Sequence, residues 1–121
     1  MELCLLAGGV TVRLATLALT LAWTHSVQKT RWEEDWRLRD GQLVIVESRV
    51  QGSGAGMEPG PSAHFDGQWW RWRPATQPLS ELVLRRSGAT ADWNVCIAGA
   101  CRPMQELLPA DADPVTMKPC G

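Results

Sequence analysis

The chain has 121 residues, of which 45% are hydrophobic and 21% charged, and its formal net charge is −1. This length forms one domain with a single core, so one domain is expected over residues 1–121. The near-neutral charge argues against a protein whose main partner is nucleic acid or an anionic membrane surface. Tryptophan is unusually frequent, with seven residues, and tyrosine is absent.

Residues 3–23 are apolar enough to suggest a signal peptide or an anchor helix, but the sequence opposes both. A signal peptide usually starts with basic residues, whereas Glu2 is acidic, and no small-x-small cleavage site precedes Trp23. Arg13 in the middle of a bilayer would cost about 2.5–3.5 kcal/mol, so no transmembrane span is expected. Alternating apolar residues instead predict three strands, with a turn at Gly8-Gly9 between the first two. These strands are Leu3–Ala7, Val10–Leu14 and Leu17–Gln28.

Asp40-Gly41 predicts the turn of a hairpin over Trp32–Val50, because both central residues of a type I′ turn take positive φ. A two-residue turn at this dipeptide sets Glu34 opposite Glu47. Their side of the hairpin is the expected core face, because it also carries Trp32, Trp36, Leu38, Leu43, Ile45 and Arg49. Two opposed carboxylates repel each other unless a cation, a proton or a metal lies between them.

His25 is a candidate partner for these carboxylates, and Arg49 and solvent are the alternatives. It lies on the more apolar face of the strand Leu17–Gln28. We therefore expect a polar binding site built from His25, Glu34 and Glu47. The alternative is a salt-bridge cluster that fixes the register of the strands. Ser26 is a further candidate binding residue, but it points away from His25, so the two cannot form a nucleophile–base pair.

A glycine-rich loop follows the hairpin over Gln51–Pro61. Such loops cradle phosphate when they lead into a helix, but here two prolines follow and no helical period or Lys-Ser/Thr pair accompanies them. The loop is expected to close over one end of the domain, with Gly54 and Gly56 completing the polar end formed by His25 and Glu34. No nucleotide and no other cofactor is expected.

Asp66-Gly67 predicts a second hairpin that sets His64-Phe65 opposite Gln68-Trp69. The following run, Trp70–Arg73, alternates tryptophan with arginine. This pattern predicts that Trp70 and Trp72 lie in the core while the arginines cover Trp69 outside. A single short basic strand in a net-acidic chain does not indicate a nucleic-acid surface.

Period-two patterns dominate the chain, and no long segment has helical spacing. Later strands are expected near Leu82–Arg85, Asp92–Ile97 and Val115–Lys118, and one or two helical turns over Arg102–Leu108. The sequence therefore predicts an all-β fold, a small antiparallel barrel or sandwich of about eight short strands. It predicts at most one short helix, near the C-terminus.

Four cysteines, Cys4, Cys96, Cys101 and Cys120, allow three pairings. A two-residue turn at Ala98-Gly99 sets Cys96 opposite Cys101, within the reach of a disulfide. If the chain is exported, Cys4 and Cys120 pair by elimination. The alternative is four reduced thiols in a cytosolic protein. No metal site is expected, because no Cys-x-x-Cys motif occurs.

Several motifs occur in the order that a known family shows. They are Trp23-Thr24-His25-Ser26-Val27, Glu33-Glu34-x-Trp36, Gly52-Ser53-Gly54-Ala55-Gly56-Met57, Trp70-x-Trp72, Leu79-x-x-Leu82 and Cys96-x4-Cys101-Arg102-Pro103. Over Leu3–Cys120 the chain resembles the small bacterial family called domain of unknown function 1850. Members of that family are often encoded beside tripartite solute transporters of the TRAP type. The resemblance implies an accessory or periplasmic role and brings no established activity.

The function expected from these features is that of a non-enzymatic binding or accessory module associated with solute transport. Its expected partner is a small organic solute or a transporter-associated protein. The alternative is a small hydrolase or isomerase that uses His25 as a base and Glu34 or Glu47 as its partner. A periplasmic location is expected, with a cytoplasmic one as the alternative because no convincing signal peptide is present.

Overall fold

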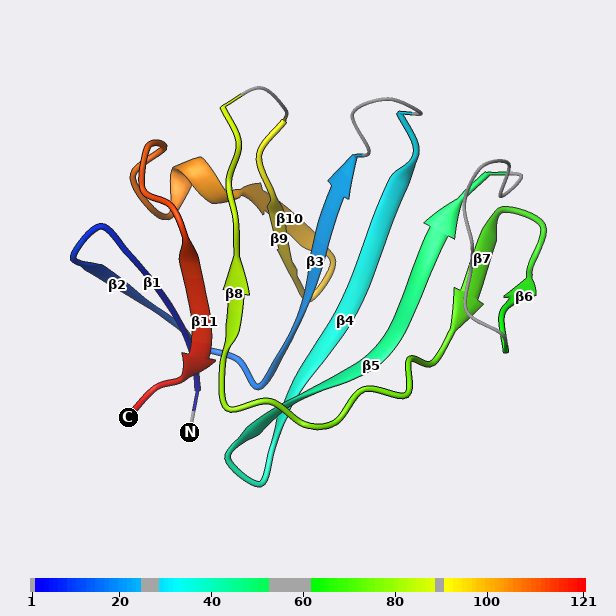
Figure 1. Ribbon diagram of the computed structural model, residues 1–121, viewed down its shortest axis with the longest axis horizontal. Helices are drawn as coiled ribbons and strands as arrows, with labels where there is room; N and C mark the ends of the chain where they lie inside the picture. The colour runs from blue at the N-terminus through cyan, green and yellow to red at the C-terminus, as the bar shows by residue number, and fades with distance from the viewer. Residues whose placement is uncertain (1, 25–28, 53–61, 89–90) are drawn as a thin grey trace.

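The computed structural model describes residues 2–24, 29–52, 62–88 and 91–121. They form two antiparallel sheets that pack face to face, with both chain ends at the smaller sheet (Figure 1). The smaller sheet has the order β2-β1-β11-β8 and comprises β1 (Leu3–Ala7), β2 (Val10–Leu14), β8 (Leu82–Leu84) and β11 (Val115–Pro119). The predicted all-β fold is thus confirmed, and of the two expected architectures, barrel or sandwich, it is the sandwich. The described residues form eleven strands, more than the eight or so expected.

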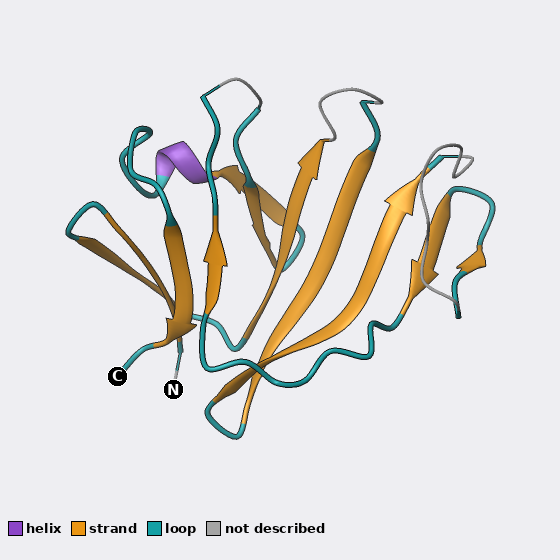
Figure 2. Cartoon of the chain, in the orientation of Figure 1, coloured by secondary structure: helices purple, strands orange, loops and turns teal. Residues whose placement is uncertain are grey.

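The larger sheet has seven strands in the order β10-β9-β3-β4-β5-β7-β6. Its strands are β3 (Ala18–Thr24), β4 (Arg31–Arg39), β5 (Gln42–Gln51), β6 (His64–Phe65), β7 (Trp69–Trp72), β9 (Asn94–Ile97) and β10 (Ala100–Pro103). A 3₁₀ turn, η1 (Met104–Glu106), is the one helical element in the described residues (Figure 2). None of the described helical structure is long and apolar enough to cross a membrane.

Two of the predicted turns are confirmed, and their central residues have the positive φ values that such turns require. Asp40 and Gly41 have φ values of 52° and 75° and join β4 to β5. Gly8 and Gly9, at 57° and 78°, join β1 to β2. Glycine adopts this left-handed region without the steric cost that a Cβ atom brings, so these sequence signals fix the turns.

The second hairpin differs from the prediction. His64 pairs with Arg71 and Phe65 with Trp70, two positions beyond the expected partners. The Asp66 side chain explains the longer loop, because its Oδ1 accepts hydrogen bonds from the backbone N–H groups of Gln68 (2.9 Å) and Trp69 (2.7 Å). Such an Asx-type cap closes a wider turn than the two-residue one predicted.

The hydrophobic core lies between the smaller sheet and one half of the larger sheet. From the smaller sheet it takes Leu3, Leu5, Val115 and Met117, all fully buried. From the larger sheet it takes Leu19, Leu21, Trp36, Leu38, Leu43, Ile45 and Val95. Backbone hydrogen bonds between Leu43 and Leu79, at 2.7 and 2.9 Å, help to close this end of the sandwich. The other half of the larger sheet's inner face lies outside the core cluster.

Two disulfides join the cysteines in the pairing that was expected for an exported chain. Cys4 of β1 is bonded to Cys120, which follows β11, across a sequence separation of 116 residues. Cys96 is bonded to Cys101 across the β9–β10 hairpin, where Ala98 and Gly99 form the turn with positive φ values of 52° and 84°. The first bond ties the two ends of the chain together, and the second closes a single hairpin.

Candidate functional site

The predicted opposition of Glu34 and Glu47 is wrong. Glu34 faces Ser48 across β4 and β5. Successive side chains of a strand point to opposite faces, so a shift of one residue moves Glu47 to the other side of the sheet. Glu34 therefore lies on the inner face, which is turned toward the smaller sheet. Glu47 and Arg49, both expected in the core, lie on the outer face.

A β-bulge in β5 produces this shift. Trp36 pairs with Ile45, as predicted, whereas Asp35 pairs with Glu47, which leaves Val46 as an extra residue. A bulge of this kind sets two residues of one strand against one residue of its partner. Beyond it toward the C-terminal end of β5, every side chain points to the face opposite the one that a regular hairpin would give.

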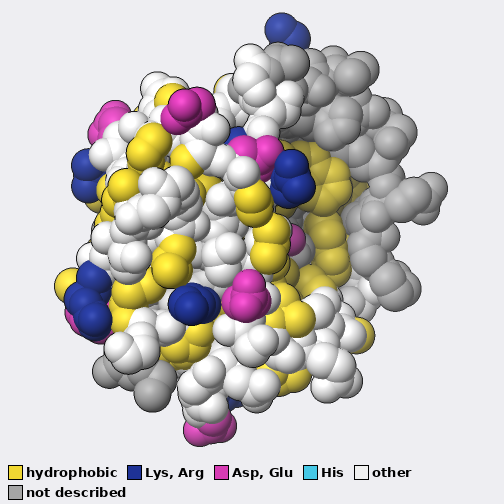
Figure 3. Space-filling model, turned by 60° about the vertical axis from the view of Figure 1, so that its left-hand side comes forward, with side chains coloured by type: hydrophobic (Ala, Val, Ile, Leu, Met, Phe, Trp, Pro, Cys, Tyr) yellow, Lys and Arg dark blue, Asp and Glu magenta, His cyan; other side chains and the backbone are white. Residues whose placement is uncertain are grey.

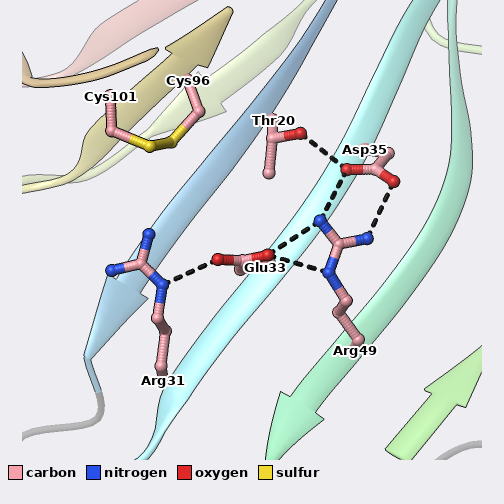
Figure 4. The surroundings of a disulfide bond; sticks show 7 residues. All are labelled: Thr20, Arg31, Glu33, Asp35, Arg49, Cys96 and Cys101. Atoms are coloured by element: carbon pink, nitrogen blue, oxygen red, sulfur yellow. Dashed lines mark hydrogen bonds and ion pairs between the residues drawn. A yellow bond between two sulfur atoms is a disulfide. The ribbon is translucent and has the colours of Figure 1, made fainter. Parts of the chain in front are cut away.

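On the outer face, Arg49 binds three carboxylates. Its guanidinium lies 2.7 Å from Glu33 Oε1 and 2.8 Å from Asp35 Oδ2 (Figure 4). It also lies 2.9 Å from Glu47 Oε1. The contact with Asp35 is bidentate, because a second nitrogen lies 3.0 Å from Oδ1. Only 14% of the Arg49 side chain is exposed. Charge-assisted bonds of this geometry are the strong kind of ion pair.

Two more arginines extend the cluster at its ends. Arg71 contacts Glu47 at 2.7 Å and Asp66 at 2.6 Å, and Arg31 contacts Glu33 at 2.7 Å. We call the whole set the outer ion network: Arg31, Arg49, Arg71, Glu33, Asp35, Glu47 and Asp66. Each of its carboxylates has an arginine partner, as in a cluster that fixes strand register.

Within the network, hydrogen bonds favour the charged forms of Asp35, Arg49 and Asp66. Burial alone would raise the pKa of Asp35, but hydrogen bonds from Arg49 and from the Thr20 hydroxyl (2.6 Å) outweigh it and lower that pKa. Burial alone would lower the pKa of Arg49, but its bonds to the carboxylates raise it. A hydrogen bond from Arg71, together with two backbone N–H groups, lowers the pKa of Asp66.

An open groove of about 500 Å³ runs beside the outer ion network, between β3, β4, β5 and the β9–β10 turn. Thr20, Asp35, Arg49 and the disulfide Cys96–Cys101 contribute to its lining. Thr20 pairs with Cys96 across β3 and β9, so the disulfide and the Thr20 side chain lie on the same face of the larger sheet (Figure 4). Most charged groups of the groove are already paired within the network. Arg37 is exposed and has no ion pair among the described residues, so the groove offers one free charge.

The inner face beyond the core carries two neighbouring rows of side chains across the larger sheet. One row is aromatic and consists of Trp23, Trp32, Val50, Trp70 and Phe65. The next row consists of Leu21, Glu34, Ser48 and Trp72. We call the four tryptophans Trp23, Trp32, Trp70 and Trp72 the tryptophan shelf. All four are only partly buried, and none belongs to the core cluster.

Ring contacts join three of the four tryptophans of the shelf. Trp23 stacks on Trp32 with centroids 6.1 Å apart, and Trp72 meets Trp32 edge-on at 6.1 Å and 89°. Trp93 packs against Trp23 at 4.9 Å. Nevertheless, the Nε1 atoms of Trp32 and Trp70 are buried without a hydrogen-bond acceptor, the two such side-chain atoms in the described part of the chain. A buried donor without an acceptor costs about 1–3 kcal/mol of stability. The tryptophan shelf is therefore less favourable for stability than an apolar core would be.

Glu34 lies in the same part of the inner face and has no cationic partner among the described residues. Its one hydrogen bond among the described side chains comes from Trp36 Nε1, at 3.2 Å from Oε1. It has no ion pair with any described residue. Burial raises the pKa of Glu34, and the bond from Trp36 opposes that shift only in part. A half-buried carboxylate without a cation needs either a proton or a charged partner.

The structure separates the predicted site residues. Glu34 and Glu47 lie on opposite faces of the larger sheet, while His25, Ser26, Gly54 and Gly56 lie outside the described residues. The polar end proposed from them therefore stays a prediction.

The sequence interpretation also missed the outer ion network. Charged residues occupy every second position along β4, at Glu33, Asp35, Arg37 and Arg39, which is the pattern of a charged strand face. This pattern is visible in the sequence. The residues of β5 that face it could not be identified, because the bulge in β5 is not predictable from the sequence.

Four large hydrophobic residues are exposed on the described surface. Its exposed large hydrophobic residues are distributed over separate elements: Val10, Leu17, Phe65 and Val83. On the face shown in Figure 3, hydrophobic side chains are interspersed with acidic and basic ones. Isolated exposed hydrophobic residues are normal on a monomer surface. The partly exposed tryptophans of the inner face are therefore the unusual feature of this molecule.

Fold and site together define a disulfide-linked antiparallel β-sandwich with a charged outer face and an aromatic inner shelf. The family model described as "Domain of unknown function (DUF1850)" matches residues 19–104, more than two thirds of the chain. The chain belongs to this family, and the matched segment contains the outer ion network and the tryptophan shelf. No curated protein and no solved structure matches the chain.

Proposed function

We propose that this chain is a non-enzymatic binding module that holds a small organic solute against the tryptophan shelf. One observation carries the proposal: Glu34, a carboxylate without a cation among the described residues, lies beside partly exposed tryptophans outside the core. Stability alone does not favour such an arrangement, because both the carboxylate and the unsatisfied indole N–H groups cost free energy. Departures of this kind are expected at functional sites.

We further propose that the module works outside the cytoplasm as an accessory to a solute transporter of the TRAP type. The two disulfides support the location, because such bonds persist in oxidising compartments. The resemblance of the motifs to a family encoded beside such transporters supports the association. Uptake of solute by the transporter, measured with and without this protein, tests the association separately.

A thermal-shift screen tests the binding function. The panel contains divalent metals, organic acids, amino acids and organic ammonium compounds, each at millimolar concentration. Binding to the native state raises the melting temperature by mass action. At least one organic solute is expected to stabilise the wild-type protein.

A matched pair of tryptophan variants locates the site. Trp72→Leu removes a ring of the shelf, whereas Trp69→Leu removes a ring of the outer face that lies 5.9 Å from the Arg49 guanidinium. The stabilisation should be lost in the first variant and kept in the second. A panel without any stabilising solute, or equal loss in both variants, contradicts the proposal.

An acid–base enzyme is the second candidate, because the raised pKa of Glu34 suits a proton-transfer role. Such a role requires a partner, and the predicted partner His25 lies outside the described residues. Turnover of a bound solute, followed by mass spectrometry of the incubated mixture, would favour the enzyme. Recovery of the solute unchanged favours the binding module.

A further inference from the structure

Three parts of the molecule could carry a further role: the outer groove, the loop region held by Arg86, and the tryptophan shelf. The groove's carboxylates are already bound to arginines, and Arg37 alone does not make a site. Arg86 is 5% exposed and is bound to Asp92, Pro109 and Ala112, so it holds loops together. The shelf has a charge that the described residues do not compensate.

Two rings of the shelf form a corner beside this charge. The planes of Trp32 and Trp72 meet at 89°, with centroids 6.1 Å apart. Trp32 precedes Glu34 by two positions on β4, so both point to the inner face. Trp72 lies in the same row as Glu34, with Ser48 between them. Ser48 has a small side chain, so the larger side chains of Glu34 and Trp72 project beyond it on either side.

Aromatic walls and a carboxylate attract the same kind of ligand. The face of an indole ring carries negative potential and attracts a cation within about 6 Å of its centroid. A carboxylate adds a full negative charge, and partial burial strengthens its attraction compared with water. An anion would meet repulsion at the same place, and a neutral apolar solute would leave the charge of Glu34 without a cation among the described residues.

We propose that the ligand of the tryptophan shelf is a small organic cation, an alkylated ammonium group held between Trp32, Trp72 and Glu34. This inference rests on the proposed binding function and specifies the chemical class of its solute. The positive group lies against the two indole faces and forms an ion pair with the Glu34 carboxylate. Its alkyl groups cover the remaining apolar surface of the rings.

Choline and its neutral isostere 3,3-dimethylbutan-1-ol form the decisive pair of probes, because they share a shape and differ by one charge. Binding is measured by isothermal titration calorimetry at constant ionic strength, with sodium chloride as the salt control. Choline is expected to bind at least about tenfold more tightly than the neutral alcohol, a difference of one decade in Kd. Equal binding of the two probes overturns the inference.

Two matched variants link this preference to Glu34. Glu34→Gln keeps the shape of the side chain and removes its charge, and should weaken choline binding at least about tenfold. Glu81→Gln, the same change at an exposed residue remote from the shelf in the β7–β8 connection, should leave binding unchanged. Circular dichroism and melting curves confirm that both variants are folded. Unchanged choline affinity in Glu34→Gln overturns the inference.

The solute panel distinguishes this failure from that of the binding function itself. If organic acids or neutral solutes stabilise the protein through Trp72 while ammonium compounds do not, the cation inference is wrong and the binding module stands. If no solute of any charge class stabilises the protein, both are wrong.

Discussion

Asp35 and Glu47 face each other directly across β4 and β5, although both are carboxylates. Arg49 makes this pairing possible, because its Nη1 atom lies 2.8 Å from Asp35 and 2.9 Å from Glu47. Opposed like charges destabilise a sheet unless a cation lies between them. The expectation that facing carboxylates require a cation thus holds here, but the bulge places Asp35, and not Glu34, opposite Glu47.

The first prediction concerns Arg49. Arg49→Leu should lower the free energy of unfolding by about 3–5 kcal/mol, because removal of one partner leaves the carboxylates of a partly buried cluster uncompensated. Urea denaturation at pH 7 measures the loss. Arg37→Leu is the control on the neighbouring strand and should stay within about 0.5 kcal/mol of wild type, since Arg37 is exposed and unpaired among the described residues. Equal effects of the two changes would show that the outer ion network does not stabilise the fold.

The second prediction concerns acid stability. The folded-state pKa of Asp35 is lowered, so its contribution to stability is full above its unfolded pKa, about 3.9. That contribution is lost as the pH falls through the lowered value. Asp35→Asn should therefore cost about 1–2 kcal/mol at pH 7 and progressively less below pH 4. Urea denaturation at several pH values gives the difference curve, and a cost that does not depend on pH contradicts the assignment.

The third prediction concerns Glu34. Its pKa is raised in the folded state, so the native protein binds more protons than the unfolded chain and loses stability as the pH rises above about 4.3. Glu34→Gln removes this loss and should leave stability at pH 7 unchanged or higher by up to about 1 kcal/mol. Denaturation at pH 4 and pH 7 shows whether the variant gains relative to wild type with rising pH. A loss of about 3–5 kcal/mol at pH 7 would reveal a buried ion pair instead.

The fourth prediction concerns the two disulfides. In the chain-entropy model, the bond across 116 residues contributes about 5 kcal/mol and the bond across 5 residues about 2 kcal/mol, although measured values often fall short. The double change of Cys4 and Cys120 to serine should therefore destabilise the protein more than the same change at Cys96 and Cys101. Thermal unfolding of the two variants compares them, and the reverse order contradicts the loop-length argument.

The oxidation state of the native protein tests the proposed location. Alkylation without a reductant, followed by intact-mass measurement of protein from its native host, should add no alkyl group. Addition at all four cysteines would place the chain in a reducing compartment and remove the proposal of an extracytoplasmic role.

Much of the fold could be predicted from the sequence, because its signals are local. Period-two alternation gave β1 and β2 with their observed ends, and the dipeptides Asp40-Gly41 and Ala98-Gly99 gave two hairpins with their turns. The hairpin at Ala98-Gly99 in turn gave one disulfide. These features depend on a few neighbouring residues, so one sequence is enough to predict them.

The site was harder to predict, because it depends on register over long distances. A single extra residue, Val46, moves the side chains of Glu47 and Arg49 from the inner to the outer face of the sheet. A valine at that position is ordinary for a strand and does not indicate a bulge. The long loop at Asp66 displaced the second hairpin for a similar reason, since a side-chain cap overrode the dipeptide signal. By contrast, Glu34 and Trp72 were placed on the inner face correctly, because neither irregularity interrupts the alternation of side chains within β4 or β7.

Chemical shifts of the indole N–H groups test the central claim, binding of an organic cation at the tryptophan shelf, most directly. Proton–nitrogen correlation spectra give one indole signal for each tryptophan, assigned by single Trp→Phe variants. Addition of choline to saturation should shift the signals of Trp32 and Trp72, while Trp69 on the outer face serves as the internal control and should not move. Shifts confined to Trp69, or no shift of any indole signal, would contradict the account.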